Sequence, residues 1–418
     1  MTAAPRASFR KSGLLPFGLA VRVFAAFAGS YFMSYGLRTI NAMIAPELLT
    51  DFGLTNAQLG SLSSAYFLGF AALQLPLGIW LDRFGSRRVD AALLLVAAAG
   101  SVMFAMAINL AMLWIGRALI GAGVAGALMC SLRAFRFWYP AERQQQLAAW
   151  MLVSGALGAL ATTVPVQMAL PVIGWRSLFW IAAALLVAAS AKIWFVLPPE
   201  PITPRVAGES SWAGYLTVFS EPYFWRFGIA SLAIQSTFIA FQSLWIGPWF
   251  RQVLDMDLAQ SGRALFLLNL VLTFSYLTLG WSVPHLTRRG WSTLSLIKVG
   301  TILLLGIETA IALAGGPLAW LLWLALALVA PVYTLVTTHV SLSFPERLTG
   351  RAFTGYNLVL FCGMFATQWL FGVLVDALGG AAHEGQGFRY ALLAWVGVQA
   401  LAFLVLVFWR VEPRQRAT

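Results

Sequence analysis

Long runs of apolar residues recur along the 418-residue chain at intervals of about 30 to 35 positions, with short polar segments between them. A continuous run of about 20 apolar residues can cross the hydrocarbon core of a bilayer as an α-helix. Strands of a membrane barrel would instead be short and would alternate apolar with polar positions. We therefore predict an all-α membrane protein with twelve transmembrane helices. The predicted spans are 23–45, 57–81, 89–109, 111–137, 146–170, 175–197, 224–249, 262–284, 291–314, 317–343, 353–378 and 389–409.

Composition supports this prediction and removes a competing one. Hydrophobic residues make up 60% of the chain and charged residues only 10%, against about 25% charged residues in soluble domains. The net charge of +12 is spread over short clusters between apolar runs, unlike the single basic face of a nucleic-acid-binding protein. Cys130 and Cys362 lie inside apolar runs, so neither a disulfide framework nor a metal centre or other cofactor is predicted.

The basic residues also predict how the chain is oriented. If the N-terminus is cytoplasmic, 20 of the 27 lysines and arginines fall on the cytoplasmic side and four on the opposite side. Loops on the cytoplasmic side of a membrane carry the excess of lysine and arginine. We therefore expect a multi-pass protein of the bacterial inner membrane with both termini in the cytoplasm. The remaining three basic residues, Arg38, Arg117 and Lys298, fall within spans.

The chain contains an internal repeat with an offset near 202 residues. Ile44-Ala45-Pro46 reappears as Ile246-Gly247-Pro248, and Ala57-Gln58-Leu59-Gly60 reappears as Ala259-Gln260-Ser261-Gly262. Several matches in order at one offset indicate a duplicated unit. We predict two pseudo-symmetric six-helix bundles over residues 1–197 and 223–418, joined by a cytoplasmic linker over 198–222.

One loop carries the most specific motif. Gly78-Ile79-Trp80-Leu81-Asp82-Arg83-Phe84-Gly85-Ser86-Arg87-Arg88 resembles the signature loop of major facilitator transporters, Gly-x-x-x-Asp-Arg-x-Gly-x-Arg-Arg, between helices two and three. The resemblance implies two halves that expose a central site alternately to each side, and a carboxylate that latches them on the cytoplasmic side. The arginines can also enforce topology. The expected gating residues are Gly78, Asp82, Arg83, Gly85, Arg87 and Arg88. The second copy has Pro284 and His285 at the Asp-Arg positions, so the latch is expected on one half only.

Two arginines within spans suggest the substrate. Arg38 lies about 12 Å from the outer end of span one and Arg117 about 9 Å into span four, at comparable depths. The acidic residues of the N-terminal half fall at loops or span ends. A guanidinium without a protein partner at membrane depth favours an anion, which its planar fork binds bidentately. Alternatively, each arginine bonds backbone carbonyls or water.

Tyr31 and Tyr35 share a helical face with Arg38, because the three follow i, i+4, i+7 spacing. This pattern resembles the organic-anion and phosphate-ester branch of the superfamily. In the C-terminal half, amides and aromatic residues within spans are further candidates for substrate contact, although each of them can equally serve as an interhelical hydrogen bond. These candidates are Gln235, Gln242, Trp245, Asn269, Tyr333, Asn357 and Gln368.

We therefore expect a monomeric secondary transporter for a small organic anion, not an enzyme. Uptake coupled to a proton is the leading hypothesis, with Glu308 and His339 as titratable groups at membrane depth. No Gly-rich phosphate loop is present to couple transport to ATP. The alternatives are efflux of a drug or metabolite, and a sensor of the same superfamily that binds its ligand without translocating it.

Overall fold

The computed structural model describes residues 14–200, 211–316, 318–379 and 384–412, and 88% of these described residues are helical. The helices of the N-terminal half are α1 (Phe17–Thr39), α2 (Asn41–Phe52), α3 (Asn56–Ala105), α4 (Leu110–Val124), α5 (Ala127–Trp138), η2 (Ala141–Arg143), α6 (Gln144–Ala161) and α7 (Val164–Val196). Those that follow are α8 (Ser211–Phe219), α9 (Pro222–Ala230), η3 (Ser231–Gln235), α10 (Ser236–Ala240), η4 (Phe241–Trp245), α11 (Ile246–Gln252), α12 (Leu258–Arg288), α13 (Thr293–Leu313), α14 (Leu321–Val329), η5 (Ala330–Tyr333), α15 (Thr334–Leu342), α16 (Glu346–Gly379) and α17 (Glu384–Phe408).

These helices form the twelve spans of the predicted fold. Ten helical segments among the described residues are long and apolar enough to cross a membrane. Two of them, α3 and α7, bend at Gly85 (φ 77°) and Gly174 (φ 72°), where the chain reverses between two spans. Residues other than glycine rarely adopt such φ values. With α6 and the first part of α7 counted as span five, the total is twelve.

Two predicted spans differ in detail from the observed helices. Span five was expected to be continuous over 146–170, but α6 ends at Ala161 and α7 starts at Val164. Pro165 explains the break, because proline lacks the N–H that would continue the helical hydrogen bonds and is well suited to the first turn of a new helix. In span one, α1 ends at Thr39, and after a break at Ile40 the separate helix α2 carries the chain past the predicted end of the span to Phe52.

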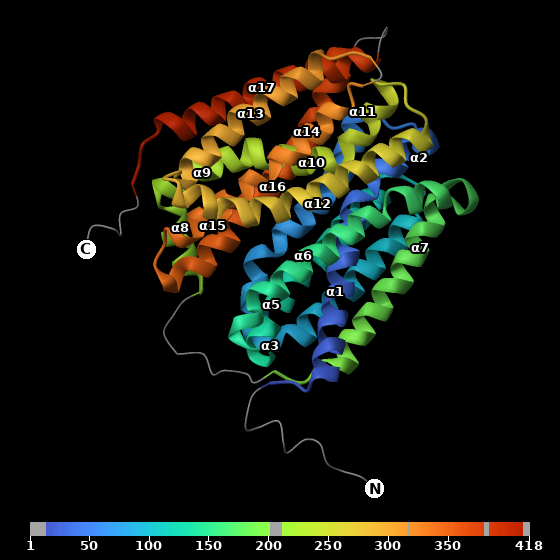
Figure 1. Ribbon diagram of the computed structural model, residues 1–418. Coiled ribbons are helices and arrows are strands. Elements are labelled where there is room, and N and C mark those ends of the chain that lie inside the picture. The colour runs from blue at the N-terminus through green and yellow to red at the C-terminus, as the bar shows by residue number, and fades with distance from the viewer. Residues whose placement is uncertain (1–13, 201–210, 317, 380–383, 413–418) are drawn as a thin grey trace.

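The helices gather in two groups, as Figure 1 shows: α1 and α3–α7 fill the lower part of the view, most of the helices from α8 onward fill the upper part, and α2 lies at the upper right near α11. The chain enters α1 and leaves α17 at the same end of the molecule. The opposite end, called the outer end below, is the one that the charge distribution predicts to be extracellular. Residues 201–210 of the predicted linker lie outside the described residues.

The two groups are in direct contact at the outer end. The segment α2 packs against η4 and α11 of the other group. A Cβ atom at Gly60 of α3 would lie 2.5 Å from the carbonyl oxygen of Gln368 on α16, and a side chain at Gly247 of α11 would collide with the backbone of Ala42. Small residues thus let the backbones approach closely, as they do between helices in lipid.

A carboxylate joins the groups at the same end. Asp376, near the end of α16, accepts hydrogen bonds from the backbone N–H of Asn56 (3.1 Å) and of Ala57 (2.7 Å) and from the side-chain amide of Asn56 (2.9 Å). These donors belong to the first turn of α3, where the unpaired N–H groups and the helix dipole favour an anion.

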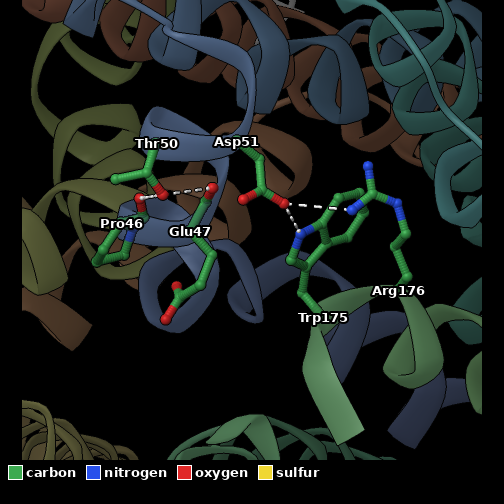
Figure 2. Close-up of polar contacts among 6 residues, drawn as sticks. All are labelled: Pro46, Glu47, Thr50, Asp51, Trp175 and Arg176. Carbon is green, nitrogen blue, oxygen red and sulfur yellow. Dashed lines mark hydrogen bonds and ion pairs between the residues drawn. The ribbon is translucent and has the colours of Figure 1, made fainter.

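Segment α2 is fixed to its own half by a second carboxylate. Figure 2 shows Asp51 accepting from the indole N–H of Trp175 at 2.9 Å and from the guanidinium of Arg176 at 3.2 Å, both at the start of the last span of α7. Glu47, one turn earlier, points away from this pair. Segment α2 is therefore fixed to the N-terminal group by Asp51. The side of α2 that packs against η4 and α11 forms the contact between the two groups.

Candidate functional site

A cavity of about 340 Å³ lies between the two helix groups. Its lining residues lie in the middle of their helices and in the helix halves that are farther from the outer end. The contact between the two groups at the outer end therefore closes the cavity on that side. Residues of the N-terminal group that line it are Tyr31, Ser34, Tyr35, Arg38, Phe70, Gln74, Val124, Ala125, Leu128, Met129, Leu132 and Leu152. The other group contributes Ile234, Gln235, Phe238, Ile239, Tyr276, Leu304, Ala330, Tyr333, Thr334, Thr337, Thr338, Phe353, Asn357, Leu360, Phe361 and Met364.

Arg38 lies in this cavity at the end of α1. Its side chain is buried, with 8% exposed, and its Nε has no hydrogen-bond partner among the described residues. The guanidinium carbon lies 4.3 Å from the ring centre of Tyr35 and within 6 Å of the rings of Phe70 and Phe361. Aromatic faces attract a cation, yet they do not accept the hydrogen bond that Nε can donate. The cavity lining thus contains a positive charge with one donor, Nε, still without a partner among the described residues.

The aromatic walls hold this arginine in place. Phe70 of α3 and Phe361 of α16 stack at 3.9 Å between ring centres, with 11° between their planes. Tyr31 and Tyr35 meet edge to face at 5.1 Å and line the cavity beside the guanidinium. The predicted shared face of these tyrosines and Arg38 therefore corresponds to one wall of the cavity.

Three of the seven candidates in the C-terminal half also line the cavity: Gln235, Tyr333 and Asn357. The carbonyl oxygen of the Gln235 side chain accepts from the hydroxyls of Ser231 (3.1 Å) and Tyr356 (2.9 Å). Its amide N–H groups are thereby left for the cavity. Tyr333 shares a hydrogen bond of 2.6 Å with Thr301.

The other four candidates lie outside the cavity lining and form hydrogen bonds within the protein. Gln242 donates to Asn269 at 2.8 Å. The indole of Trp245 donates to the backbone carbonyl of Gln368 at 3.2 Å, and the Gln368 side chain donates to Ser243 at 3.2 Å. These contacts correspond to the alternative of interhelical hydrogen bonds.

Arg117 also lies outside the cavity. Its side chain is 1% exposed, and it donates to the backbone carbonyl of Leu37 at 2.8 Å. That carbonyl belongs to the last turn of α1, where a cation is favourable. Arg117 therefore lies at a depth similar to that of Arg38, but its side chain does not enter the cavity. Its hydrogen bond stabilises the end of α1, the helix that carries Arg38.

Several lining residues were not among the sequence candidates. They include Gln74, one turn from Phe70 on α3, and Tyr276 on α12. A glutamine within an apolar run was a usable signal for the first. Nothing in the sequence distinguishes Phe70 and Phe361 from the many other phenylalanines, because their role depends on meeting across two groups.

The signature loop forms a network within the N-terminal group and the linker. Asp82 pairs with Arg133 of α5 at 2.6 Å, and Arg133 lies 3.6 Å from Glu200. Glu200 accepts from the backbone N–H of Ser86 at 2.8 Å, immediately after the turn at Gly85. Arg87 donates to the carbonyl of Leu197, whereas Arg83 and Arg88 are exposed. A Cβ atom added at Gly78 would lie 3.8 Å from the hydroxyl of Tyr215, an ordinary van der Waals contact.

The two titratable candidates for proton coupling lie away from the cavity lining. Glu308 of α13 is 2% exposed and accepts from the amide of Gln399 on α17 at 2.5 Å. His339 of α15 is bonded to the hydroxyl of Tyr223 at 2.8 Å. A third group, Asp90, was expected at a span end but is 1% exposed, with Ser30 at 3.4 Å.

Comparison with known proteins identifies the family. The model of the Major Facilitator Superfamily matches residues 27–367. The chain belongs to the Major Facilitator Superfamily. It is therefore a multi-pass membrane protein of a family of transporters, which are not enzymes, and this agrees with the expectation drawn from the signature loop.

Individual relatives are more distant. The probable sulfoacetate transporter SauU of Cupriavidus necator is 31% identical over 156 residues, which are 37% of this chain and 36% of that protein. Probable anion transporter 4, chloroplastic, of Oryza sativa subsp. japonica is 26% identical over 294 residues, 64% of this chain and 48% of that protein. The matches thus span about a third to a half of the length of these relatives.

Solved structures agree in fold. A bacterial homologue of the human lysosomal transporter Spinster, in an inward-facing and unoccupied conformation, superposes with a TM-score of 0.77 at 17% identity. The match covers 94% of this chain and 98% of that chain. The shared fold thus extends over almost the whole of both chains.

Proposed function

We propose that this protein is a secondary active transporter that takes up a small organic anion by alternating access. One observation carries the proposal: Arg38 places a buried guanidinium, with an unpartnered Nε, in the cavity between the two halves. A charge at membrane depth is costly unless something neutralises it, and no carboxylate among the described residues forms an ion pair with Arg38. A carboxylate or similar group of the cargo would supply the missing partner.

The relatives support an anionic cargo. One is named a probable sulfoacetate transporter and another a probable anion transporter. Both names describe those proteins and not this chain. An anionic cargo in general agrees with the positive charge of Arg38 in the cavity, whereas the apolar cavity walls alone would suit an amphipathic compound and hence efflux.

We propose a proton as the coupling ion, with Glu308 as the carrying group. Thr301, Leu304 and Glu308 lie on one face of α13. The first bonds Tyr333 and the second lines the cavity. The carboxyl group of Glu308 is thus one turn beyond a cavity residue, in a buried position where gain or loss of a proton changes its interaction with Gln399. His339 is the second candidate, through its bond to Tyr223.

We also propose that the transporter works as a monomer in the bacterial inner membrane, with both termini cytoplasmic and with halves at 1–197 and 223–418. The excess of basic residues on one side of the spans supports this orientation. In that orientation, the outer contact through Asp376 closes the extracellular side, and the cavity faces the cytoplasm.

Binding to purified protein tests the proposed function. Organic anions are screened for an increase in melting temperature, and the best ligand is titrated against the parent protein and Arg38→Gln. Loss of a charge-assisted hydrogen bond corresponds to about 1.5 to 3 kcal/mol, so affinity should fall by about tenfold or more. Arg389→Gln is the matched control, because Arg389 bonds the backbone carbonyls of Ala312 and Ala314 and lies outside the cavity lining.

Proteoliposome flux separates a transporter from a sensor. An imposed inward proton gradient should drive accumulation of the ligand, and Glu308→Gln should abolish the dependence on the gradient while exchange of ligand continues. Equal binding by Arg38→Gln and the parent would overturn the anion site. Binding without accumulation would favour a sensor.

A further inference from the structure

The cavity contains a single charged side chain among its described lining residues, and that side chain is Arg38. The other buried charged groups near it do not line the cavity: Arg117 bonds the carbonyl of Leu37, Asp90 lies beside Ser30, and Glu308 bonds Gln399. A cargo in the cavity therefore meets a net protein charge of +1. This count is independent of which anion is transported.

The charge count limits the charge of the cargo. One anionic group on Arg38 exchanges its hydration for a bidentate partner. A second anionic group would lose its hydration as well, but no further cation of the lining would replace it, and an unpaired charge in a poorly polarisable site is strongly disfavoured. A monoanion is therefore compatible with the cavity, whereas a dianion is penalised.

The remaining polar lining indicates the rest of the cargo. The ring centre of Phe361 lies 5.7 Å from the Arg38 guanidinium. Asn357 lies one turn away from Phe361 on α16, nearer the cytoplasmic end, and also lines the cavity. Four residues of a helix cover about 6 Å. At this inner level the other half presents hydroxyl and amide groups from several helices, and these are Gln235, Thr334, Thr337, Thr338 and Asn357. Such groups bind hydroxyls in preference to alkyl chains.

We infer that the cargo is a hydroxylated organic monoanion, with its single acidic group on Arg38 and its hydroxylated body directed toward Asn357 and the threonines of α15. The cavity volume of about 340 Å³ lies at the small end of ligand sites, about 300 to 1,000 Å³, and suits a compound of a few carbons. This inference rests on the proposed function, since it specifies what occupies the same site.

Matched pairs of anions test the inference. Each pair has the same carbon skeleton and differs in one ionised group: gluconate against glucarate, and isethionate against sulfoacetate. Titrations at pH 7.5 use the purified parent protein, Arg38→Gln and the control Arg389→Gln. In every pair that binds to the parent protein, we expect the monoanion to bind at least tenfold more tightly than the dianion. The affinity for the monoanion should be lost in Arg38→Gln and kept in the control Arg389→Gln. Hexanoate, which has the length of gluconate without its hydroxyls, should bind at least tenfold more weakly.

A change of selectivity provides a second readout. Asn357→Lys adds a second positive charge one turn from the aromatic pair, and it should shift the ratio of dianion to monoanion affinity upward by tenfold or more. Thr338→Lys places the charge at another lining position and serves if the first variant does not fold. An Arg38-dependent dianion that binds as tightly as its monoanion partner would overturn the inference and leave the anion site intact. Absence of Arg38-dependent binding by every compound would overturn the proposed function together with the inference.

Discussion

Two buried arginines at similar depth have different roles. Arg117 donates to the backbone carbonyl of Leu37 and lies outside the cavity lining, whereas Arg38 lines the cavity among aromatic neighbours and forms no ion pair among the described residues. The difference arises from the direction in which each helix presents its side chain. One guanidinium is structural, and the other is placed to meet a ligand.

Replacing Arg117 should therefore affect stability without affecting ligand affinity. In Arg117→Met the carbonyl of Leu37 loses its partner in a buried position, which costs about 1 to 3 kcal/mol. The melting temperature of the purified protein should fall, while the additional increase caused by the best anion is retained. A loss of the ligand-induced increase comparable with that in Arg38→Gln would show that Arg117 contacts the anion.

Glu47 should make stability depend on pH. It lies on α2, beyond the predicted end of span one, and burial raises the pKa of its carboxyl above the ordinary value, although Arg251 lowers it in part. The folded protein then binds this proton more tightly than the unfolded chain, so the destabilising effect is absent below the ordinary pKa and grows as pH rises through the folded pKa. In Glu47→Gln, the gain in melting temperature over the parent should increase between pH 4.5 and 8.

The control for this measurement is Glu412→Gln, which removes an exposed carboxylate near the end of the described chain. Its difference from the parent should not follow the same course. A gain for Glu47→Gln that is constant, or that shrinks as the pH rises, would contradict the assigned cause.

At the level of helices, polar cavity residues coincide with interruptions of α-helical geometry. Arg38 precedes the break between α1 and α2, Gln235 ends the π-helical turn η3, and Tyr333 ends the 3₁₀ turn η5, which contains Pro331. Such interruptions redirect side chains and are frequent at functional sites. They also divide spans one, seven and ten into shorter helical segments.

Asp376 is the clearest contact between helices of opposite halves. Its carboxylate accepts three hydrogen bonds from the first turn of α3. Asp376→Asn removes the charge that the helix N-terminus favours, worth about 0.5 to 1 kcal/mol at an exposed site. The ratio of outer-open to outer-closed molecules should therefore rise by roughly two- to fivefold.

Spin labels can measure this shift. Thr50→Cys on α2 and Arg263→Cys on α12 place labels at exposed positions of the two halves at the outer end, in a background without Cys130 and Cys362. Asp376→Asn should increase the fraction of long distances. Asp255→Asn, which changes an exposed carboxylate of the same end, is the control. An unchanged distance distribution in Asp376→Asn would show that the contact does not hold the outer end closed.

At the level of the whole molecule, carboxylates lie at opposite ends of one helix pair. Asp376 ends α16 at the outer end, and Asp82 ends the first span of α3 at the inner end, where it pairs with Arg133 of its own half. In the family resembled by the signature loop, the inner carboxylate latches the halves when the outer side is open. The two carboxylates would therefore stabilise opposite states.

Substitutions at the two ends should accordingly have opposite effects. With the same spin labels, Asp82→Asn should reduce the outer-open fraction, and the double variant with Asp376→Asn should lie between the two single variants. A shift of Asp82→Asn in the same direction as Asp376→Asn would exclude a latch at the inner end.

Much of this architecture is predictable because run length and composition determine a membrane span. Local sequence is enough to predict the twelve spans and the departure of the second signature loop from the motif. It also predicts the helical face that Tyr31, Tyr35 and Arg38 share. What a single sequence does not contain is how helices turn toward one another. Depth along the helix made Arg117 equivalent to Arg38, and spacing made Gln242 equivalent to Gln235, but packing directs Gln242 to Asn269 instead of the cavity.

The central claim is that the guanidinium of Arg38 holds the negative group of the cargo, and a structure of the protein with its tightest-binding anion tests it most directly. We predict an oxygen of the anionic group at about 2.7 to 2.9 Å from a guanidinium nitrogen of Arg38. An anion bound elsewhere in the cavity, with Arg38 bonded to protein groups alone, would contradict the claim.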